Sequence, residues 1–126
     1  AREQEVLRVV DDQISGPTWA RLLAEVTALI LAQGRDDPAG YIRQKAGLYH
    51  LAGSGSSSRF EWAQEILELD PQKSEQKVRE LLPAKSSEFP TPAERPLVSV
   101  LECGRFERTF GLQLPAWQEA LQLALD

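Results

Sequence analysis

Hydrophobic residues recur along the chain with two different periods, which predict where strands and helices lie. The short run Val6–Val10 is rich in β-branched residues and stops at the polar residues Asp11–Gln13, which predicts a strand followed by a loop. From Trp19 onward the apolar residues recur at helical spacing, which predicts an amphipathic helix that ends near Gly34. The apolar positions of this helix are Leu22, Leu23, Val26 and Ile30.

The middle of the chain combines turn residues, one apolar run and a second helical stripe. Asp36–Gly40 has the composition of a turn, and Gly47–Ala52 is predicted to form a short buried strand. The Gly/Ser run Gly53–Ser58 then leads into a helix. Ser57 or Ser58 is expected to cap it, because a serine hydroxyl can accept a hydrogen bond from a free backbone N–H of the first turn. The apolar stripe of that helix consists of Trp62, Ile66 and Leu69.

The C-terminal half begins with an irregular stretch. Residues 70–96 contain five prolines, which forbid a long helix because proline lacks the backbone N–H that a helix interior needs. A short strand is predicted around Val78–Leu82, a brief helix from about Gly104 to Gly111, and a last helix opened by Pro115. The whole pattern predicts an α/β fold: a small mixed lobe of helices and short strands. The apolar positions of the last helix are Trp117, Ala120, Leu121, Ala124 and Leu125.

Composition narrows the class of protein. The chain has 126 residues, 14 basic and 19 acidic side chains, a net charge of −5 and 42% hydrophobic residues. These values fit one folded domain and argue against a disordered tail or a cationic nucleic-acid-binding arm. The longest purely apolar stretch, Ala28–Ala32, is far shorter than the ~20 residues of a membrane span. We therefore expect no nucleic acid and no membrane among the partners.

The cysteine and methionine content bears on the cellular location of the chain and on whether it is part of a longer polypeptide. Its single cysteine, Cys103, excludes an intrachain disulfide and favours a reduced, cytoplasmic location. Methionine is absent, position 1 included, so we expect a piece of a longer polypeptide.

Three features could carry chemistry, and a structural role is favoured for each. Gly53–Ser58 stands between a predicted strand and a helix, where backbone N–H groups can cradle a phosphate. Ser58 occupies the place of a third motif glycine and no P-loop lysine follows, so a capped connection is favoured. His50 and Cys103 have no partners whose spacing would identify a metal site or a catalytic triad.

Two polar segments stiffened by proline are the main candidates for ligand binding. One combines Asp11–Gln13 with Gly16–Thr18, and the other is Phe89–Pro96. Within the second, Arg95 stands between Glu94 and a proline. A guanidinium held in this way suits bidentate binding of a phosphate, whereas the alternative is an exposed ion pair with Glu94.

Several short pieces match one known family in its own order, and they span almost the whole chain. They are Val9–Gln13 with Pro17 and Thr18, Gly47–Gly53, Phe89–Pro96 with Ser99 and Leu101, Phe106–Gly111, and Leu114 and Pro115 with Trp117. Through these pieces the sequence resembles the dTDP-4-dehydrorhamnose reductases, which belong to the extended short-chain dehydrogenase/reductase group.

The resemblance implies that residues 1–126 are the C-terminal sugar-nucleotide-binding domain of such a reductase. The parent enzyme would convert dTDP-4-dehydro-L-rhamnose to dTDP-L-rhamnose with hydride from NADPH or NADH. The family's Gly-rich fingerprint and Tyr-x-x-x-Lys catalytic pair belong to an N-terminal Rossmann domain, so we expect no cofactor site and no catalytic residue in this chain. By resemblance, Gln13, Pro17 and Thr18 lie near the substrate cleft, and Arg95 binds the diphosphate.

Some family features are altered or lost. The family has a glycine and then a small residue between its Gln and Pro-Thr, whereas here the order is Ser15-Gly16. Some members form dimers bridged by magnesium through glutamates. One of those positions aligns with Arg21, so no metal site is expected.

The pairing of the segment Gly47–Ala52 and the function of the domain each have more than one possible outcome. The segment Gly47–Ala52 resembles an edge strand of the Rossmann sheet, so here it must pair locally, pair with another chain or stay exposed. The uncovered inter-domain face predicts self-association. A non-catalytic sugar-nucleotide-binding or regulatory module of the same architecture is the alternative function.

Overall fold

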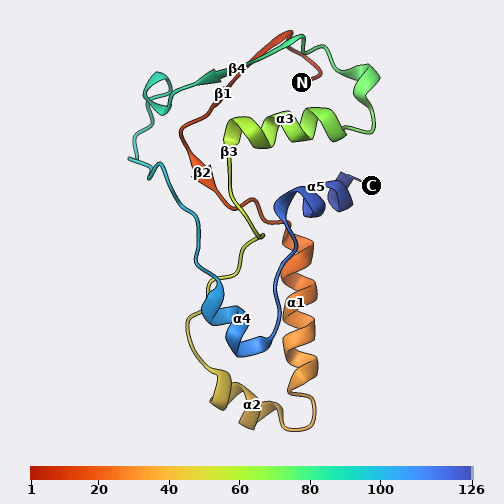
Figure 1. The fold of residues 1–126 in the computed structure, drawn as a ribbon, viewed down its shortest axis with the longest axis vertical. Helices are drawn as coiled ribbons and strands as arrows, with labels where there is room; N and C mark the ends of the chain where they lie inside the picture. Colours follow the sequence, from red (N-terminus) through yellow and green to blue (C-terminus); the bar gives the residue numbers. More distant parts are fainter. Residues whose placement is uncertain (126) are drawn as a thin grey trace.

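The computed structural model describes residues 1–125, which form helices and short strands in an elongated arrangement (Figure 1). Strand β1 (Val6–Val10) pairs in parallel with β4 (Glu80–Ala84), and β2 (Ile14–Ser15) pairs antiparallel with β3 (Ser57–Ser58). The crossover between β1 and β4 includes α3 (Arg59–Leu69), which packs beside β1. The predicted mixed α/β fold is confirmed.

The remaining helices extend from beside α3 to the other end of the molecule (Figure 1). They are α1 (Ala20–Gln33), α2 (Pro38–Lys45), α4 (Gly104–Phe110) and α5 (Trp117–Leu125), together with 3₁₀ turns at Lys73–Glu75 and Ser86–Glu88. The sequence predictions of β1, α1, α3, α4 and α5 are confirmed. Helix α4 ends as expected at Gly111, whose φ of 67° lies in the left-handed region that glycine adopts without strain.

Three sequence predictions are wrong in their details. Asp36–Gly40 is not merely a turn, because Asp37 caps a helix that begins at Pro38 and accepts a hydrogen bond from the Gly40 N–H at 3.0 Å. The strand predicted around Val78–Leu82 begins two residues later. Gly47–Ala52 forms no strand within residues 1–125, since no neighbouring strand supplies backbone partners.

The best-packed region is a small apolar cluster between α1 and α4. Val26, Phe106 and Leu114 are buried there. Tyr49 and Phe110 pack against it, with their ring centroids 5.0 Å apart and their planes at 65°. Edge-to-face contacts of this kind add to the burial of apolar area. This cluster fixes α4 and the residues around Tyr49 on the face of α1.

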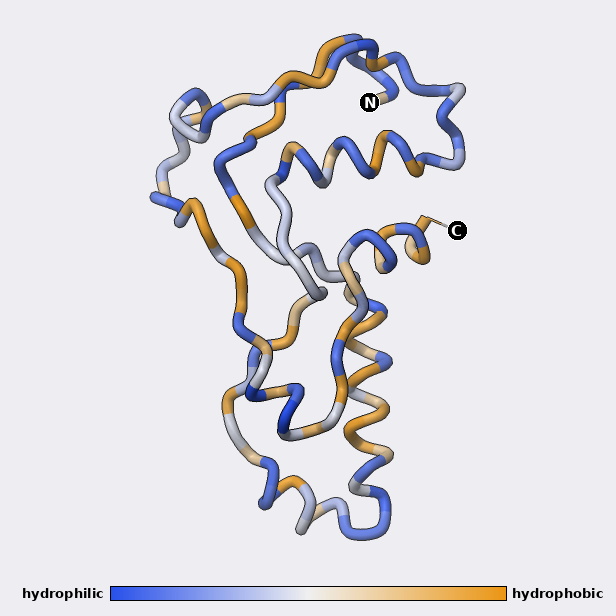
Figure 2. The backbone as a smooth tube through the Cα atoms, viewed as in Figure 1, coloured by the Kyte–Doolittle hydropathy of each residue, from blue (hydrophilic) through white to orange (hydrophobic). Residues whose placement is uncertain are grey.

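Much of the remaining apolar surface is uncovered. The accessible area is 8762 Å², whereas a compact monomer of 14.1 kDa exposes roughly 6,700 Å². Leu48, Val98 and Leu31 are exposed by 75%, 65% and 61%, and Figure 2 shows an apolar stretch in the extended segment before α4. No helix within residues 1–125 has the length and apolar character of a membrane span.

Candidate functional site

Gln13 lies between β1 and β2, and its side-chain amide is held from two sides. Its Nε2 donates to Ser86 Oγ at 3.0 Å, and its Oε1 accepts from Arg59 Nε at 2.9 Å. Its backbone carbonyl also accepts from the Arg59 N–H at 3.2 Å. These contacts fix which way the amide faces, because the donor and the acceptor end each have a distinct partner.

Asp12 binds the same serine through both of its oxygens. The Ser86 hydroxyl donates to Oδ1 at 2.6 Å, and the Ser86 N–H lies 3.0 and 3.1 Å from the two oxygens. The hydrogen bond from this hydroxyl is the main reason why the pKa of Asp12 lies below its ordinary value. Residues 12 and 13 are thereby joined to the 3₁₀ turn Ser86–Glu88.

Arg95 lies on the exposed segment that follows this turn. The segment returns to the same strand, because the Ile14 N–H donates to the Leu97 carbonyl at 2.7 Å and the Ser99 N–H donates to the Ile14 carbonyl at 2.9 Å. Gln13 and the segment that carries Arg95 are therefore joined through hydrogen bonds of Ser86 and Ile14. Within residues 1–125 Arg95 forms no ion pair, with Glu94 or with any other carboxylate.

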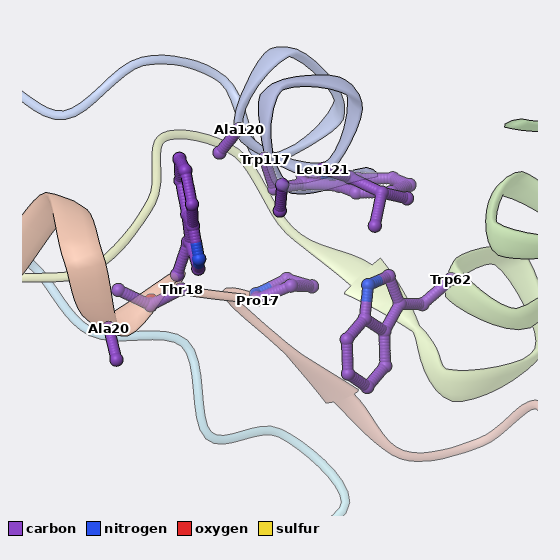
Figure 3. A pocket seen from close by; sticks show the side chains of 9 residues that line it. Pro17, Thr18, Ala20, Trp62, Trp117, Ala120 and Leu121 are labelled. Carbon is purple, nitrogen blue, oxygen red and sulfur yellow. The ribbon is translucent and has the colours of Figure 1, made fainter. Parts of the chain in front are cut away.

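Pro17 and Thr18 occupy a different environment. Thr18 Oγ1 donates to the Gly16 carbonyl and accepts from the Gly53 N–H, both at 3.0 Å. Both residues line a cavity of about 180 Å³ between α1, α3 and α5 (Figure 3). Neither Gln13 nor Arg95 lines this cavity. The other lining residues are Trp19, Ala20, Trp62, Trp117, Ala120, Leu121 and Ala124.

The Gly53–Ser58 loop hydrogen-bonds several of its polar groups within the chain, while the buried Ser57 hydroxyl has no hydrogen-bond partner within residues 1–125. The Ser54 N–H donates to the Pro115 carbonyl at 2.9 Å, and the Ser58 N–H donates to Glu61 at 2.7 Å. In return the Ser58 hydroxyl accepts from the Glu61 N–H at 3.1 Å, which completes a capping box on α3. The predicted cap is confirmed. The N–H groups of Gly53, Ser54 and Ser58 are therefore already hydrogen-bonded within the chain, and the Glu61 carboxylate lies beside the last of them.

The family model of the RmlD substrate binding domain matches residues 1–126. The chain belongs to this family. Its relatives include the dTDP-4-dehydrorhamnose reductase of Burkholderia thailandensis, 35% identical over 129 residues, which cover 99% of this chain and 43% of the relative. The reductase of Escherichia coli (strain K12) is 34% identical, with 100% of this chain and 41% of the relative covered.

Solved structures of dTDP-4-dehydrorhamnose reductases also match this RmlD substrate binding domain. A dTDP-4-dehydrorhamnose reductase from Clostridium acetobutylicum matches with a TM-score of 0.74 at 31% identity, over 95% of this chain and 38% of that one. The Bacillus anthracis reductase in complex with NADP matches with a TM-score of 0.72 at 32% identity, over 97% and 38%. The chain thus spans about two-fifths of the length of these relatives.

One Tyr-x-x-x-Lys spacing does occur in this RmlD domain, so the expectation that this chain lacks such a pair is wrong. Tyr41 and Lys45 stand four residues apart on α2. The Tyr41 hydroxyl donates to Gln33 Oε1 at 2.7 Å, and Lys45 Nζ donates to the Thr109 carbonyl at 3.2 Å. Both groups tie α2 to its neighbours, so the spacing alone gives no reason to assign them a catalytic role.

Other side chains considered from the sequence have local roles or solvent contact. Arg21 donates to Glu25 at 2.8 Å and lies over the Trp19 ring, 5.5 Å from its centroid. His50 is exposed and Cys103 is half-buried. No group of three or more potential metal ligands gathers within residues 1–125.

Proposed function

We propose that the chain is the substrate-binding domain of an NAD(P)H-dependent reductase that converts dTDP-4-dehydro-L-rhamnose to dTDP-L-rhamnose. The observation that carries the proposal is the family match over the whole chain, together with relatives that are named dTDP-4-dehydrorhamnose reductase. The reaction belongs to the complete polypeptide, of which this chain supplies walls of the sugar-nucleotide site.

Arg95 is the residue we assign to the diphosphate. Arg95 is exposed and forms no ion pair within residues 1–125, so a phosphate would not have to displace a carboxylate. A charge-assisted, bidentate contact with phosphate oxygens is the strongest interaction open to this side chain. Gln13 is assigned to the same site, since its amide is already oriented by Ser86 and Arg59. Pro17 and Thr18 would shape the neighbouring wall.

The nicotinamide cofactor, NADPH or NADH, supplies the hydride when it is bound to the complete enzyme. We assign its site and the proton donor to an N-terminal Rossmann domain, because the N–H groups of Gly53, Ser54 and Ser58 in the Gly/Ser loop of this chain are already hydrogen-bonded. Residues of this chain would bind and orient the sugar nucleotide. We further propose a cytoplasmic location, which the single cysteine supports.

The N-terminal domain is also the partner that we propose for the uncovered surface. The surplus of roughly 2,000 Å² over a compact monomer exceeds the 600–1,500 Å² of a typical inter-domain interface, so it has room for one. Gly47–Ala52 offers unpaired backbone groups beside exposed apolar residues such as Leu48. A sheet edge in the partner would satisfy those groups.

The test compares Arg95→Ala with Arg43→Ala in the full-length protein. Arg43 is an exposed arginine on α2 that forms no ion pair within residues 1–125, so its substitution makes the same charge change elsewhere. We expect Arg95→Ala to raise KM for the dTDP-sugar about 10- to 100-fold with kcat less affected, because the diphosphate is remote from the reacting carbonyl. Arg43→Ala should match wild type.

Two results would contradict this assignment. A folded Arg95→Ala protein with wild-type KM would leave Arg95 as a surface residue. Turnover of dTDP-4-dehydrorhamnose and NADPH by residues 1–126 alone would refute the division of labour, because a cofactor site and a proton donor would then have to lie in this chain.

A non-catalytic binding or regulatory module remains the second candidate, because the same architecture can serve without catalysis. The residues preceding this segment in the gene decide between the two. A Gly-rich strand-to-helix motif and a Tyr-x-x-x-Lys pair there would favour the reductase. Their loss, combined with retained binding of the dTDP-sugar, would favour the module.

A further inference from the structure

Arg95 lies in a loop whose two ends are both hydrogen-bonded to the short segment Asp12–Ile14. At its start, Ser86 is bound by Asp12; at its end, the Leu97 carbonyl is bound by the Ile14 N–H at 2.7 Å. Asp12 and Ile14 are only two residues apart, so the two anchors sit close together. The loop between them, residues 87–96, has every residue exposed.

The two anchors are of different kinds. The anchor at Leu97 is a backbone hydrogen bond, which continues in the bond from the Ser99 N–H to the Ile14 carbonyl. The anchor at Ser86 depends on side chains. The Ser86 hydroxyl donates its hydrogen to Asp12 Oδ1 at 2.6 Å. Its oxygen is therefore the acceptor for Gln13 Nε2, which lies 3.0 Å away. One hydroxyl thus holds both the loop and the amide of Gln13.

We propose that Ser86, fixed by Asp12, is a positioning residue that sets the affinity of the site for the diphosphate of the sugar nucleotide by holding the Arg95 loop and the Gln13 amide together. The inference rests on the proposed function. Ser86 does not touch the ligand. It reduces the number of conformations open to the Arg95 guanidinium and the Gln13 amide before binding, so less entropy is lost when the ligand orders them.

The cost of ordering explains why such an anchor matters. An exposed loop loses conformational entropy when a ligand immobilises it. Prolines at 90, 92 and 96 already restrict the interior of this loop. The Leu97 end is secured by backbone bonds, and the Ser86 end is held by Asp12 together with Arg8, which pairs with Glu88 and lies 6.0 Å from the centroid of the Phe89 ring. Loss of the Ser86 hydroxyl would therefore loosen the loop at one end, where the Ser86 N–H bond to Asp12 and the Arg8 contacts remain, and would weaken binding without removing a ligand contact.

The experiment measures KM for the dTDP-sugar and kcat in the full-length protein for four single variants. Ser86→Ala removes the hydroxyl, Ser86→Thr keeps it, and Asp12→Asn removes the carboxylate charge. Ser87→Ala is the matched control, because the neighbouring Ser87 is exposed and its hydroxyl makes no hydrogen bond within residues 1–125. The double variant of Ser86→Ala with Arg95→Ala tests whether the two residues act through each other.

We expect Ser86→Ala and Asp12→Asn to raise KM about 3- to 10-fold, the size of one lost side-chain hydrogen bond, with kcat unchanged. Ser86→Thr and Ser87→Ala should match wild type. In the Arg95→Ala background, Ser86→Ala should raise KM by much less than it does alone, because the residue it positions is gone. A general loss of stability would instead lower active-enzyme content and kcat.

The outcomes separate this inference from the proposed function. If wild type does not act on or bind the dTDP-sugar, the proposed function fails. If wild type binds and Arg95→Ala weakens binding, but Ser86→Ala equals Ser87→Ala, only the inference fails. It also fails if the effects of Ser86→Ala and Arg95→Ala are additive, or if a folded Asp12→Asn protein keeps wild-type KM. Should Ser86→Ala not fold, the Asp12→Asn result decides.

Discussion

The cluster between α1 and α4 and the exposed apolar side chains of Leu48 and of residues 97–101, here called the open face, differ in what covers them. Phe106 is 4% exposed in the cluster, whereas Leu48 and Val98 on the face are 75% and 65% exposed. The backbone differs in the same way. Helix α4 pairs backbone groups within its own turns, and its Thr109 and Phe110 carbonyls accept hydrogen bonds from Lys45 and Gln33, while residues 47–52 belong to no sheet within residues 1–125.

This difference indicates which part of the chain folds on its own contacts. Apolar side chains that remain in water contribute little to stability, so the free energy of folding must come from the cluster and from the packing around Trp117. The open face has residue types that are typical of a strand and of a hydrophobic core. Within residues 1–125 no second strand pairs with residues 47–52, and no other element covers the exposed side chains of the open face. Its contribution appears only when another surface covers it.

The sharpest test of the comparison is a matched pair of truncations, Phe106→Ala and Leu48→Ala. Phe106→Ala should lower the free energy of unfolding of the isolated chain by about 3–5 kcal/mol, because it removes a buried ring and leaves a cavity. Leu48→Ala should change it by less than about 0.5 kcal/mol. Urea titration followed by tryptophan fluorescence measures both. Equal effects would mean that the open face is packed in solution.

The open face itself is tested by association. We expect the isolated chain to self-associate through this face, because exposed apolar patches and free strand edges attract a second copy. Leu48→Asp should weaken this association about tenfold, the effect of a strong interface residue. Leu123→Asp makes the same change on α5, where Leu123 is 55% exposed, and is the control. Sedimentation velocity over a concentration series reads the result; a wild-type monomer at all concentrations would refute the expectation.

The capping box of α3 gives a smaller effect. Ser58→Ala removes the hydroxyl that accepts the Glu61 N–H, and should lower the free energy of unfolding by about 1 kcal/mol. Ser56→Ala, in the exposed part of the same loop, is the control. If the two substitutions cost the same, the cap contributes nothing in solution.

What the sequence could predict follows the same division between local and long-range contacts. The cap at Ser58 and the end of α4 at Gly111 depend on neighbours in sequence, so the residue types alone indicated them. The strand expected at 47–52 depends on a neighbour that this chain does not supply. Likewise, the family resemblance singled out Gln13 and Arg95, but their joint anchoring through Ser86 links residues more than 70 positions apart. No local pattern contains that contact.

The smallest expected effect is a pH dependence at the end of the molecule that carries β1, β4 and α3. Hydrogen bonds from Ser86 to Asp12, from Gln76 to Asp70 and from the Lys85 N–H to Glu88 are the main causes that hold the pKa values of these carboxyls below their ordinary range. The folded state therefore binds fewer protons than the unfolded state as these groups titrate. Their stabilisation is complete above about pH 5 and is lost as the pH falls below about 4, through the folded-state values.

Because these carboxyls are near the surface, water and salt reduce the effect, and we expect only a modest fall of Tm below about pH 4. Asp70→Asn should flatten that fall, since an amide does not titrate. Asp36→Asn makes the same charge change on the exposed turn before α2 and controls for net charge. Thermal unfolding between about pH 7 and pH 3 measures the slopes. A Tm that rises toward low pH in the wild-type chain, or an Asp70→Asn slope as steep as that of wild type, would show that the hydrogen bonds to Asp70 do not hold in solution.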